Sequence, residues 1–332
     1  MFDFTYLWVA IIGFGLLMYI LADGFDLGVG MLFPFAANED ERDVMMNSVA
    51  PVWDGNETWL ILGGAGLLAA FPLVYAVFLP ALYIGVFLLL AGLIFRGVAF
   101  EFRFKASAQG KPMWNLAFTG GSLVATFAQG AVVGAYIQGF QTENMRYVGG
   151  AFDWLTPFTV MTGLGLVAGY SLLGATWLVL KTEGALQVRM RQWSLRLLSV
   201  VMGFFVIVSV WTPLKDAYVH DRWFGNLSWL WILPAATVIT ATLIARWIRS
   251  GREALPFLGT IALFGLFYGG LLFSKWPYVV PPNHTFHDAA SAPASQLFLL
   301  VGVLFVIPFV LMYTAWTYYV FRGKVKLGVG YH

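Results

Sequence analysis

The stretch FTYLWVAIIGFGLLMYILA at residues 4–22 decides the fold class, because it is long enough to cross a lipid bilayer and carries no charge. A membrane-spanning helix needs about 20 predominantly apolar residues. The whole chain has this character, since 60% of its 332 residues are hydrophobic and 11% are charged. Soluble domains carry about 25% charged residues. The sequence therefore predicts an all-α integral membrane protein whose first apolar stretch is a retained span rather than a cleaved signal peptide.

Nine segments of the chain are apolar enough to be predicted as spans. They cover residues 4–25, 56–73, 78–102, 115–138, 157–180, 196–213, 229–248, 255–274 and 296–321. The second segment is the weakest, because it is rich in glycine and only the short stretch 71–80 separates it from the third. If these two formed one re-entrant hairpin, the number of spans would fall to about seven or eight.

The Lys and Arg residues between these segments predict the orientation, because cytoplasmic loops carry the excess of positive charge. With the N-terminus in the periplasm, 14 of the 19 Lys and Arg residues lie on the cytoplasmic side, 4 lie outside and Arg96 lies within a span. The cytoplasmic set consists of Arg42, Arg103, Lys105, Lys111, Lys181, Arg189, Arg191, Arg196, Arg246, Arg249, Arg252, Arg322, Lys324 and Lys326. We therefore expect a multi-pass protein of a bacterial cytoplasmic (inner) membrane, with its C-terminus in the cytoplasm.

The loops between the spans are short, so residues 1–332 are predicted to form one polytopic domain. The first and fifth spans are both helices interrupted by glycines and followed by a charged loop, which favours two four-helix bundles. The bundles would cover approximately residues 1–150 and 151–280. Residues 281–332 would then form a peripheral last helix and the tail.

Several kinds of chemistry are excluded by the composition. The chain has no cysteine, which excludes disulfides and thiolate metal sites. Its four histidines, His220, His284, His287 and His332, all fall in predicted loops or at the terminus. Because membrane haems take axial ligands such as His from within helices, the chain is not expected to ligate haem or another metal. The net charge of +2 and the scattered basic residues give no indication of nucleic-acid binding.

Ionisable residues within spans are costly in lipid and indicate function. Asp23 and Asp26 lie three residues apart on one helical face near the inner end of the first span, and Asp54 repeats this spacing with Glu57 at the start of the second. Arg96 lies inside the third span, and Glu101 follows near its inner end. These groups would form a proton path from the cytoplasm, in which Asp26 and Asp54 are best placed to titrate.

The alternatives for these residues are structural. Arg96 could simply neutralise one or two Asp residues and hold three helices together. Asp54 could be only the N-cap of the second span. Trp59 lies one turn into that span beside the acids, where it would anchor the helix at the interface or line a small apolar channel.

Six blocks of sequence carry a resemblance to one family. They are DGFDLGVG at 23–30, MNSVAPVWDGNETW at 46–59, FRGVAFE at 95–101, FDWLTP at 152–157, GYSLLGATW at 169–177 and KTEG at 181–184. These blocks resemble subunit II of the cytochrome bd-type quinol oxidases, including the cyanide-insensitive bacterial branch. The blocks extend from the first to the fifth predicted membrane span. The C-terminal half resembles the family in its length and its number of spans.

The resemblance implies the haem-free subunit of a terminal oxidase that oxidises quinol and reduces dioxygen to water. It implies an obligate heterodimer with subunit I, which would hold two b-type haems and one d-type haem, so that this chain is not catalytic alone. It assigns Asp54 to the cytoplasmic proton path and Trp59 to an apolar dioxygen route, and regards Asp26 and the Arg96/Glu101 pair as functional. Some family members carry Gln at the position of Glu57, so no essential proton role is assigned to Glu57.

Two other functions fit parts of the same pattern. A proton-driven secondary transporter would explain the Asp and Arg set, although it predicts broken helices and a site at the membrane midplane. A scaffold that only stabilises a haem subunit is the third alternative. The sequence leaves open which quinone is used, whether a structural quinone or lipid binds here, and whether a small single-helix subunit joins.

Overall fold

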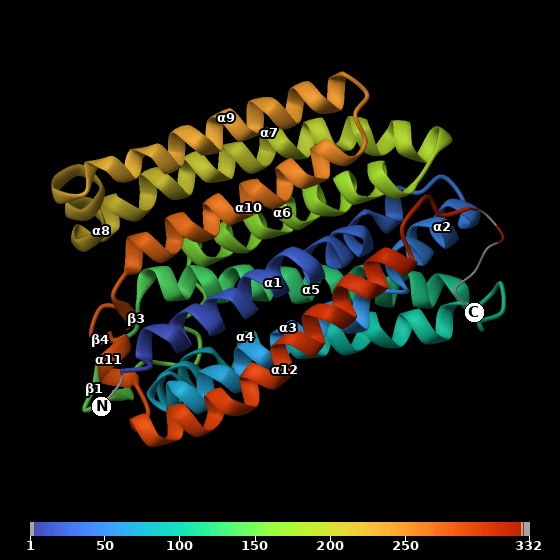
Figure 1. Ribbon diagram of the computed structural model, residues 1–332. Coiled ribbons are helices and arrows are strands. Elements are labelled where there is room, and N and C mark those ends of the chain that lie inside the picture. Colours follow the sequence, from blue (N-terminus) through green and yellow to red (C-terminus); the bar gives the residue numbers. More distant parts are fainter. Residues whose placement is uncertain (1–2, 327, 329–332) are drawn as a thin grey trace.

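Long helices that run side by side build the molecule, as seen in the computed structural model of Figure 1, which describes residues 3–326 and 328. Within the described residues, eight helices are long and apolar enough to cross a membrane. They are α1 (Thr5–Leu32), α4 (Pro72–Arg103), α5 (Lys111–Gln138), α6 (Pro157–Lys181), α7 (Gly184–Lys215), α9 (Ile232–Arg249), α10 (Ala254–Lys275) and α12 (Pro293–Val320).

A further helix, α3 (Trp53–Ala70), corresponds to the second predicted span. It is not a re-entrant hairpin: it has 18 residues, which corresponds to about 27 Å of helix, and Pro72 begins α4 directly after it. Its mean hydropathy is reduced by the polar first turns, which carry Asp54 and Glu57. The prediction of about nine membrane helices therefore agrees with the eight apolar spans of the described residues taken together with α3.

The bundle has two ends, which differ in the short elements that close them (Figure 1). The end that carries η1 (Phe33–Phe35) and α2 (Glu39–Val49), here called the α2 end, also carries the C-terminal tail. The opposite end, here called the hairpin end, lies beside the N-terminus. Its elements are the antiparallel pairs β1 (Thr142–Glu143) with β2 (Arg146–Tyr147) and β3 (Tyr278–Val280) with β4 (His284–Thr285), and the short helices α8 (Ala217–Asp221), η2 (Arg222–Asn226), η3 (Ser228–Trp231) and α11 (Phe286–Ala289).

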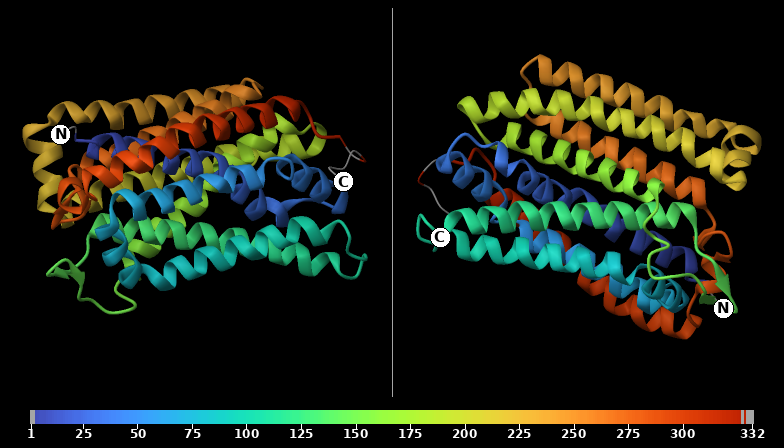
Figure 2. Two further views of the ribbon diagram at one scale, coloured as in Figure 1. Left: turned by 60° about the horizontal axis from the view of Figure 1, so that its bottom comes forward. Right: turned by 180° about the vertical axis from the view of Figure 1, so that it is seen from behind.

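The long helices form two groups of four, as the sequence predicts. Helices α1, α3, α4 and α5 lie together, and α6, α7, α9 and α10 form the other group (Figure 1). Helix α12 lies outside both, along α3, and only Gln296 and Leu300 of its residues are buried. The right view of Figure 2 shows α12, in red, at the lower margin of the molecule. The subdivision at residues 150 and 280 stays a prediction, because one continuous core contains buried residues of both groups.

Two glycines bring the groups into backbone contact. A Cβ atom on Gly28 of α1 would lie 1.9 Å from the Tyr170 carbonyl oxygen of α6, and one on Gly174 would lie 2.4 Å from the Gly28 carbonyl carbon. Small residues permit such close approach of membrane helices. Helix α1 is therefore held in the middle of the molecule, with Asp23 and Asp26 surrounded by protein on all sides.

Candidate functional site

The centre of the site is Arg96, a fully buried residue in the second half of α4. Its Nη1 donates a hydrogen bond to Asp23 of α1, and its Nη2 donates one of 2.7 Å to Glu57 Oε2 of α3. The guanidinium therefore joins three helices. A buried arginine is stable only when such hydrogen-bonded partners offset the loss of hydration.

Asp26 lies one turn further along α1 and is also fully buried, but its contacts are with uncharged groups. The Asn56 side chain on α3 donates from Nδ2 to Asp26 Oδ2 at 2.7 Å and to the Ala22 carbonyl oxygen at 3.3 Å. The Tyr318 hydroxyl on α12 donates to Asn56 Oδ1 at 2.8 Å. Asp26 is therefore linked through one amide to the last helix of the chain.

The cluster contains more acid than base: three carboxyl groups lie around one guanidinium. Several polar atoms within it have no hydrogen-bond partner among the described residues, namely Asp23 Oδ2, Asp26 Oδ1 and Arg96 Nε. A low-dielectric interior penalises both unpaired charge and unpaired polar atoms. An arrangement of this kind favours a bound proton on one of the carboxyl groups, which is the chemistry that a proton-transfer site needs.

Aromatic side chains enclose the cluster. The Arg96 guanidinium carbon lies 5.7 Å from the Trp53 ring centre, and Trp53 in turn stacks on Phe100 at 4.9 Å. Trp59 is fully buried and contacts Phe14 edge-to-face at 5.7 Å, and its indole nitrogen has no partner among the described residues. Rings of this kind exclude bulk water and strengthen the electrostatic interactions inside.

The remaining predicted residues lie outside this cluster. Asp54 is exposed in the first turn of α3. Glu101 is exposed on α4 and lies 3.8 Å from Lys105 Nζ, so the Arg96/Glu101 pairing is not formed. The reason is geometric: five residues of helix turn the Glu101 side chain about 140° away from Arg96. The acids that do contact Arg96 come from α1 and α3.

Two members of the site, Asn56 and Tyr318, are not predicted from the sequence. Glu57, which the family resemblance leaves without an essential proton role, is the second partner of Arg96. Asn56 precedes it in the chain and could have been noticed as a polar residue on the inner face of α3. Tyr318 gave no signal, because a tyrosine near the end of a span is typical of the interfacial belt.

No group of three or more His, Cys, Asp or Glu residues in the described part of the chain could hold a metal ion. His284 and His287 both lie at the hairpin end, where His284 Nε2 is 3.2 Å from Thr142 Oγ1. His332 lies outside the described residues. His220, His284 and His287 therefore lie in short elements outside the long helices.

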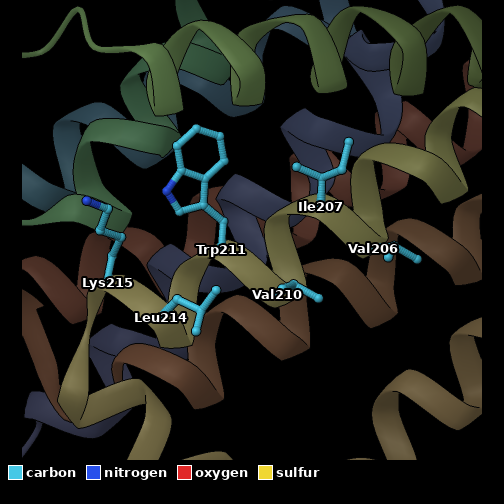
Figure 3. A pocket seen from close by; sticks show the side chains of 6 residues that line it. All are labelled: Val206, Ile207, Val210, Trp211, Leu214 and Lys215. Carbon is cyan, nitrogen blue, oxygen red and sulfur yellow. The ribbon is translucent and has the colours of Figure 1, made fainter.

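An apolar hollow lies elsewhere, on α7. It measures about 510 Å³ and is lined by Val206, Ile207, Val210, Trp211, Leu214 and Lys215 (Figure 3). These residues repeat every three or four positions along one helix and form an apolar stripe with a single charged end. It contains no acid and no hydrogen-bonded network, so the buried charge cluster, not this hollow, is the candidate site.

These features define the class: a polytopic helical membrane protein with a buried, acid-rich charge cluster between three helices. Over residues 4–321 the chain matches the family described as cytochrome bd terminal oxidase subunit II, and it belongs to that family. It is a multi-pass membrane subunit of an oxidoreductase complex, a quinol oxidase that contains haem and a subunit 1 partner.

Relatives cover nearly the whole chain. Cytochrome bd-I ubiquinol oxidase subunit 2 of Escherichia coli (strain K12) is 31% identical, over 96% of this chain and 94% of the relative. Cytochrome bd ubiquinol oxidase subunit 2 of Bacillus subtilis (strain 168) is also 31% identical, over 96% of each chain. A chain of the bd oxidase from Geobacillus thermodenitrificans superposes with a TM-score of 0.78 at 16% identity, covering 95% of this chain and 96% of that one, and supports the fold.

Proposed function

We propose that this chain carries protons from the cytoplasm toward the haems of its partner subunit, and that it stabilises that subunit. The observation that supports this role is the acid excess of the buried cluster around Arg96. The α2 end is assigned to the cytoplasm because the Lys and Arg residues of the loops gather there. The N-terminus and the hairpin end would then lie in the periplasm.

The proposed path follows decreasing exposure from the α2 end inward. Asp54 is exposed in the first turn of α3, and Glu57, one turn further on, keeps 27% of its side-chain surface exposed. Asp23 and Asp26 are fully buried beyond it. Carboxyl groups three residues apart lie on one helical face, so Asp54 and Glu57 face the same side of α3, as Asp23 and Asp26 do on α1. Glu101, exposed near the same end, is a second candidate entry point.

Each residue has a separate task in this proposal. Arg96 fixes Asp23 and Glu57 by charge and hydrogen bonds, and Asp26, which has no salt bridge among the described residues, accepts and releases the transferred proton. Trp59 is the candidate for lining an apolar dioxygen route, since its buried ring lies one turn beyond the cluster on α3. The haems would be two of b type and one of d type in subunit I.

The test is Asp26→Asn in the intact complex, reconstituted in vesicles. We expect oxygen consumption with quinol to fall by about 10²-fold or more, the usual effect of losing a positioned proton donor or acceptor. Haem content should be unchanged. Asp54→Asn should cause a smaller loss, because an exposed entry group can be replaced by water. Asp40→Asn, which changes an exposed acid at the same end, is the matched control.

The outcomes separate the alternatives. If Asp26→Asn removes haem together with activity, the cluster is structural and the chain is a scaffold. Unchanged oxygen consumption would remove Asp26 from the mechanism. The transporter alternative does not fit membership in a family of oxidase subunits.

A further inference from the structure

A chain of two hydrogen bonds connects α12 with the buried acid of α1. Asn56 contacts the Ala22 carbonyl oxygen and the Asp26 carboxyl group with one end of its amide, and the Tyr318 hydroxyl with the other. A backbone carbonyl can only accept, so the end of the amide that faces it must be the nitrogen. The Tyr318 hydroxyl therefore donates its single hydrogen to Asn56 Oδ1, and the lone pairs of its oxygen stay free to accept.

A small crevice between α3 and α12 opens at the same two residues. Its volume is about 10 Å³, and Asn56, Thr314 and Tyr318 are among the residues that line it. This is close to the smallest space that holds one water molecule. Thr314 Oγ1 is buried and has no hydrogen-bond partner among the described residues. Two hydroxyl groups and an amide thus surround a space of the size of one water.

We propose that Tyr318 is a positioning residue of the proton path, which together with Asn56 fixes the Asp26 carboxyl. One water molecule bound in the crevice would hydrogen-bond to the Tyr318 oxygen and to Thr314 Oγ1. The inference rests on the proposed function. It assigns a role to α12, which otherwise packs loosely on the bundle. A carboxyl held from one side presents its other oxygen in a constant direction, and small losses of such alignment reduce transfer rates.

The surroundings of Asp26 explain why a neutral support is needed there. Asp23 and Tyr19 lie on the same helix, Glu57 lies on α3 and Arg96 on α4. Arg96 is already shared between Asp23 and Glu57. The Asn56–Tyr318 pair therefore holds Asp26 without adding a charge, which leaves the carboxyl free to change its protonation state.

The experiment is Tyr318→Phe in the intact, membrane-reconstituted complex. The ring, which lies 6.4 Å from Phe25 and 6.3 Å from Trp177 between centroids, is retained and only the hydroxyl is lost. We expect oxygen consumption at saturating quinol to fall about threefold to tenfold, the range that one lost hydrogen bond gives. The pH profile of the rate should change, whereas haem content and the KM for quinol should not.

Two further variants make the result decisive. Tyr319→Phe is the matched control, because Tyr319 is the next residue on α12 and is largely exposed; it should leave the rate unchanged. Thr314→Val removes the hydroxyl that would hold the water, with an expected loss of about twofold. A wild-type rate and pH profile in Tyr318→Phe, an equal loss in Tyr319→Phe, or loss of haem in Tyr318→Phe would each overturn the inference. If Asp26→Asn is slow while Tyr318→Phe is not, only this inference fails; if Asp26→Asn is fully active, the proposed function fails first.

Discussion

Two arginines of α4 show what separates a structural ion pair from the candidate site. Arg96 and Arg103 lie seven residues apart on the same face of one helix, and both side chains are fully buried. Each binds two carboxylates that come from other elements. They differ in how completely their nitrogens are satisfied and in whether their partners reach water.

Arg103 is fully satisfied at the α2 end. Its Nε donates to Asn115 Oδ1 at 2.6 Å, its Nη1 to Asp43 Oδ1 at 2.6 Å and its Nη2 to Glu39 Oε2 at 2.8 Å. The two acids keep 34% and 43% of their side-chain surface exposed. This arrangement ties α2 and α5 to α4, and its acids can return to water when the pair opens. It is a clamp.

Arg96 is satisfied less completely, and its partners are buried more deeply. Its Nε is unpartnered within the described protein, Asp23 has no exposed surface, and Asp26 adds a third acid that no cation contacts. A clamp needs none of these features. Acid excess and unpaired atoms therefore distinguish the Arg96 cluster from the Arg103 clamp, since a buried arginine occurs in both places.

The largest effect is expected from Arg96→Leu. The change leaves Asp23 and Glu57 without their cation in a buried site, which costs about 3–5 kcal/mol. The complex should lose thermal stability and haem, measured by the thermal midpoint and the visible spectrum. Arg96→Lys keeps the charge with poorer geometry and should recover part of both. If Arg96→Leu assembled with full stability, the distinction between the two arginines would be wrong.

Arg103→Leu should have a smaller effect. Because Glu39 and Asp43 can turn toward water, the cost is that of lost hydrogen bonds, about 1–3 kcal/mol. Oxygen consumption per haem should stay within about twofold of the wild type, because a clamp does not transfer protons. A drop in the rate per haem as large as that of Asp26→Asn would show that the α2-end network belongs to the path.

Glu57→Gln sharpens the comparison within the cluster itself. The amide oxygen can still accept from Arg96 Nη2, so the helix contact is kept while one negative charge is removed. We expect oxygen consumption within about threefold of the wild type, the effect of weakening one hydrogen bond. Parallel measurement of Asp26→Asn identifies which acid matters. Equal losses in both variants would assign the transferred proton to the acids that contact Arg96, Asp23 and Glu57, instead of to Asp26.

The sequence predicts the membrane class and about nine helices, and it offers the alternative that Arg96 neutralises one or two Asp residues, because long apolar runs and buried charges have few alternatives in lipid. It does not predict that Glu101 faces away from Arg96 or that Glu57 faces toward it. Such contacts depend on how each helix is rotated about its axis, which packing against neighbours sets. The Tyr318–Asn56 bond joins residues 262 positions apart and depends on where α12 lies. No local pattern carries that information.

The smallest expected effect concerns the pH dependence of the α2-end clamp. Partial burial disfavours the charged Glu39 carboxylate, but the hydrogen bond and charge of Arg42, with the charge of Arg103, outweigh it and lower the pKa of Glu39 below its usual 4.5. A group whose pKa is lowered by folding stabilises the folded state above its unfolded pKa, and this contribution is lost as the pH falls through the folded value.

The thermal midpoint of the complex should therefore be insensitive to Glu39 protonation at neutral pH and should decline as the pH falls below about 4.5. Glu39→Gln should flatten part of this decline, because the amide cannot take up the proton. The change should be small, since Glu39 is largely hydrated and exposed ion pairs contribute little. Asp40→Asn on the same helix is the control. A decline that is equally steep in Glu39→Gln and wild type would assign the acid sensitivity to the buried cluster instead, where hydration cannot replace a lost partner.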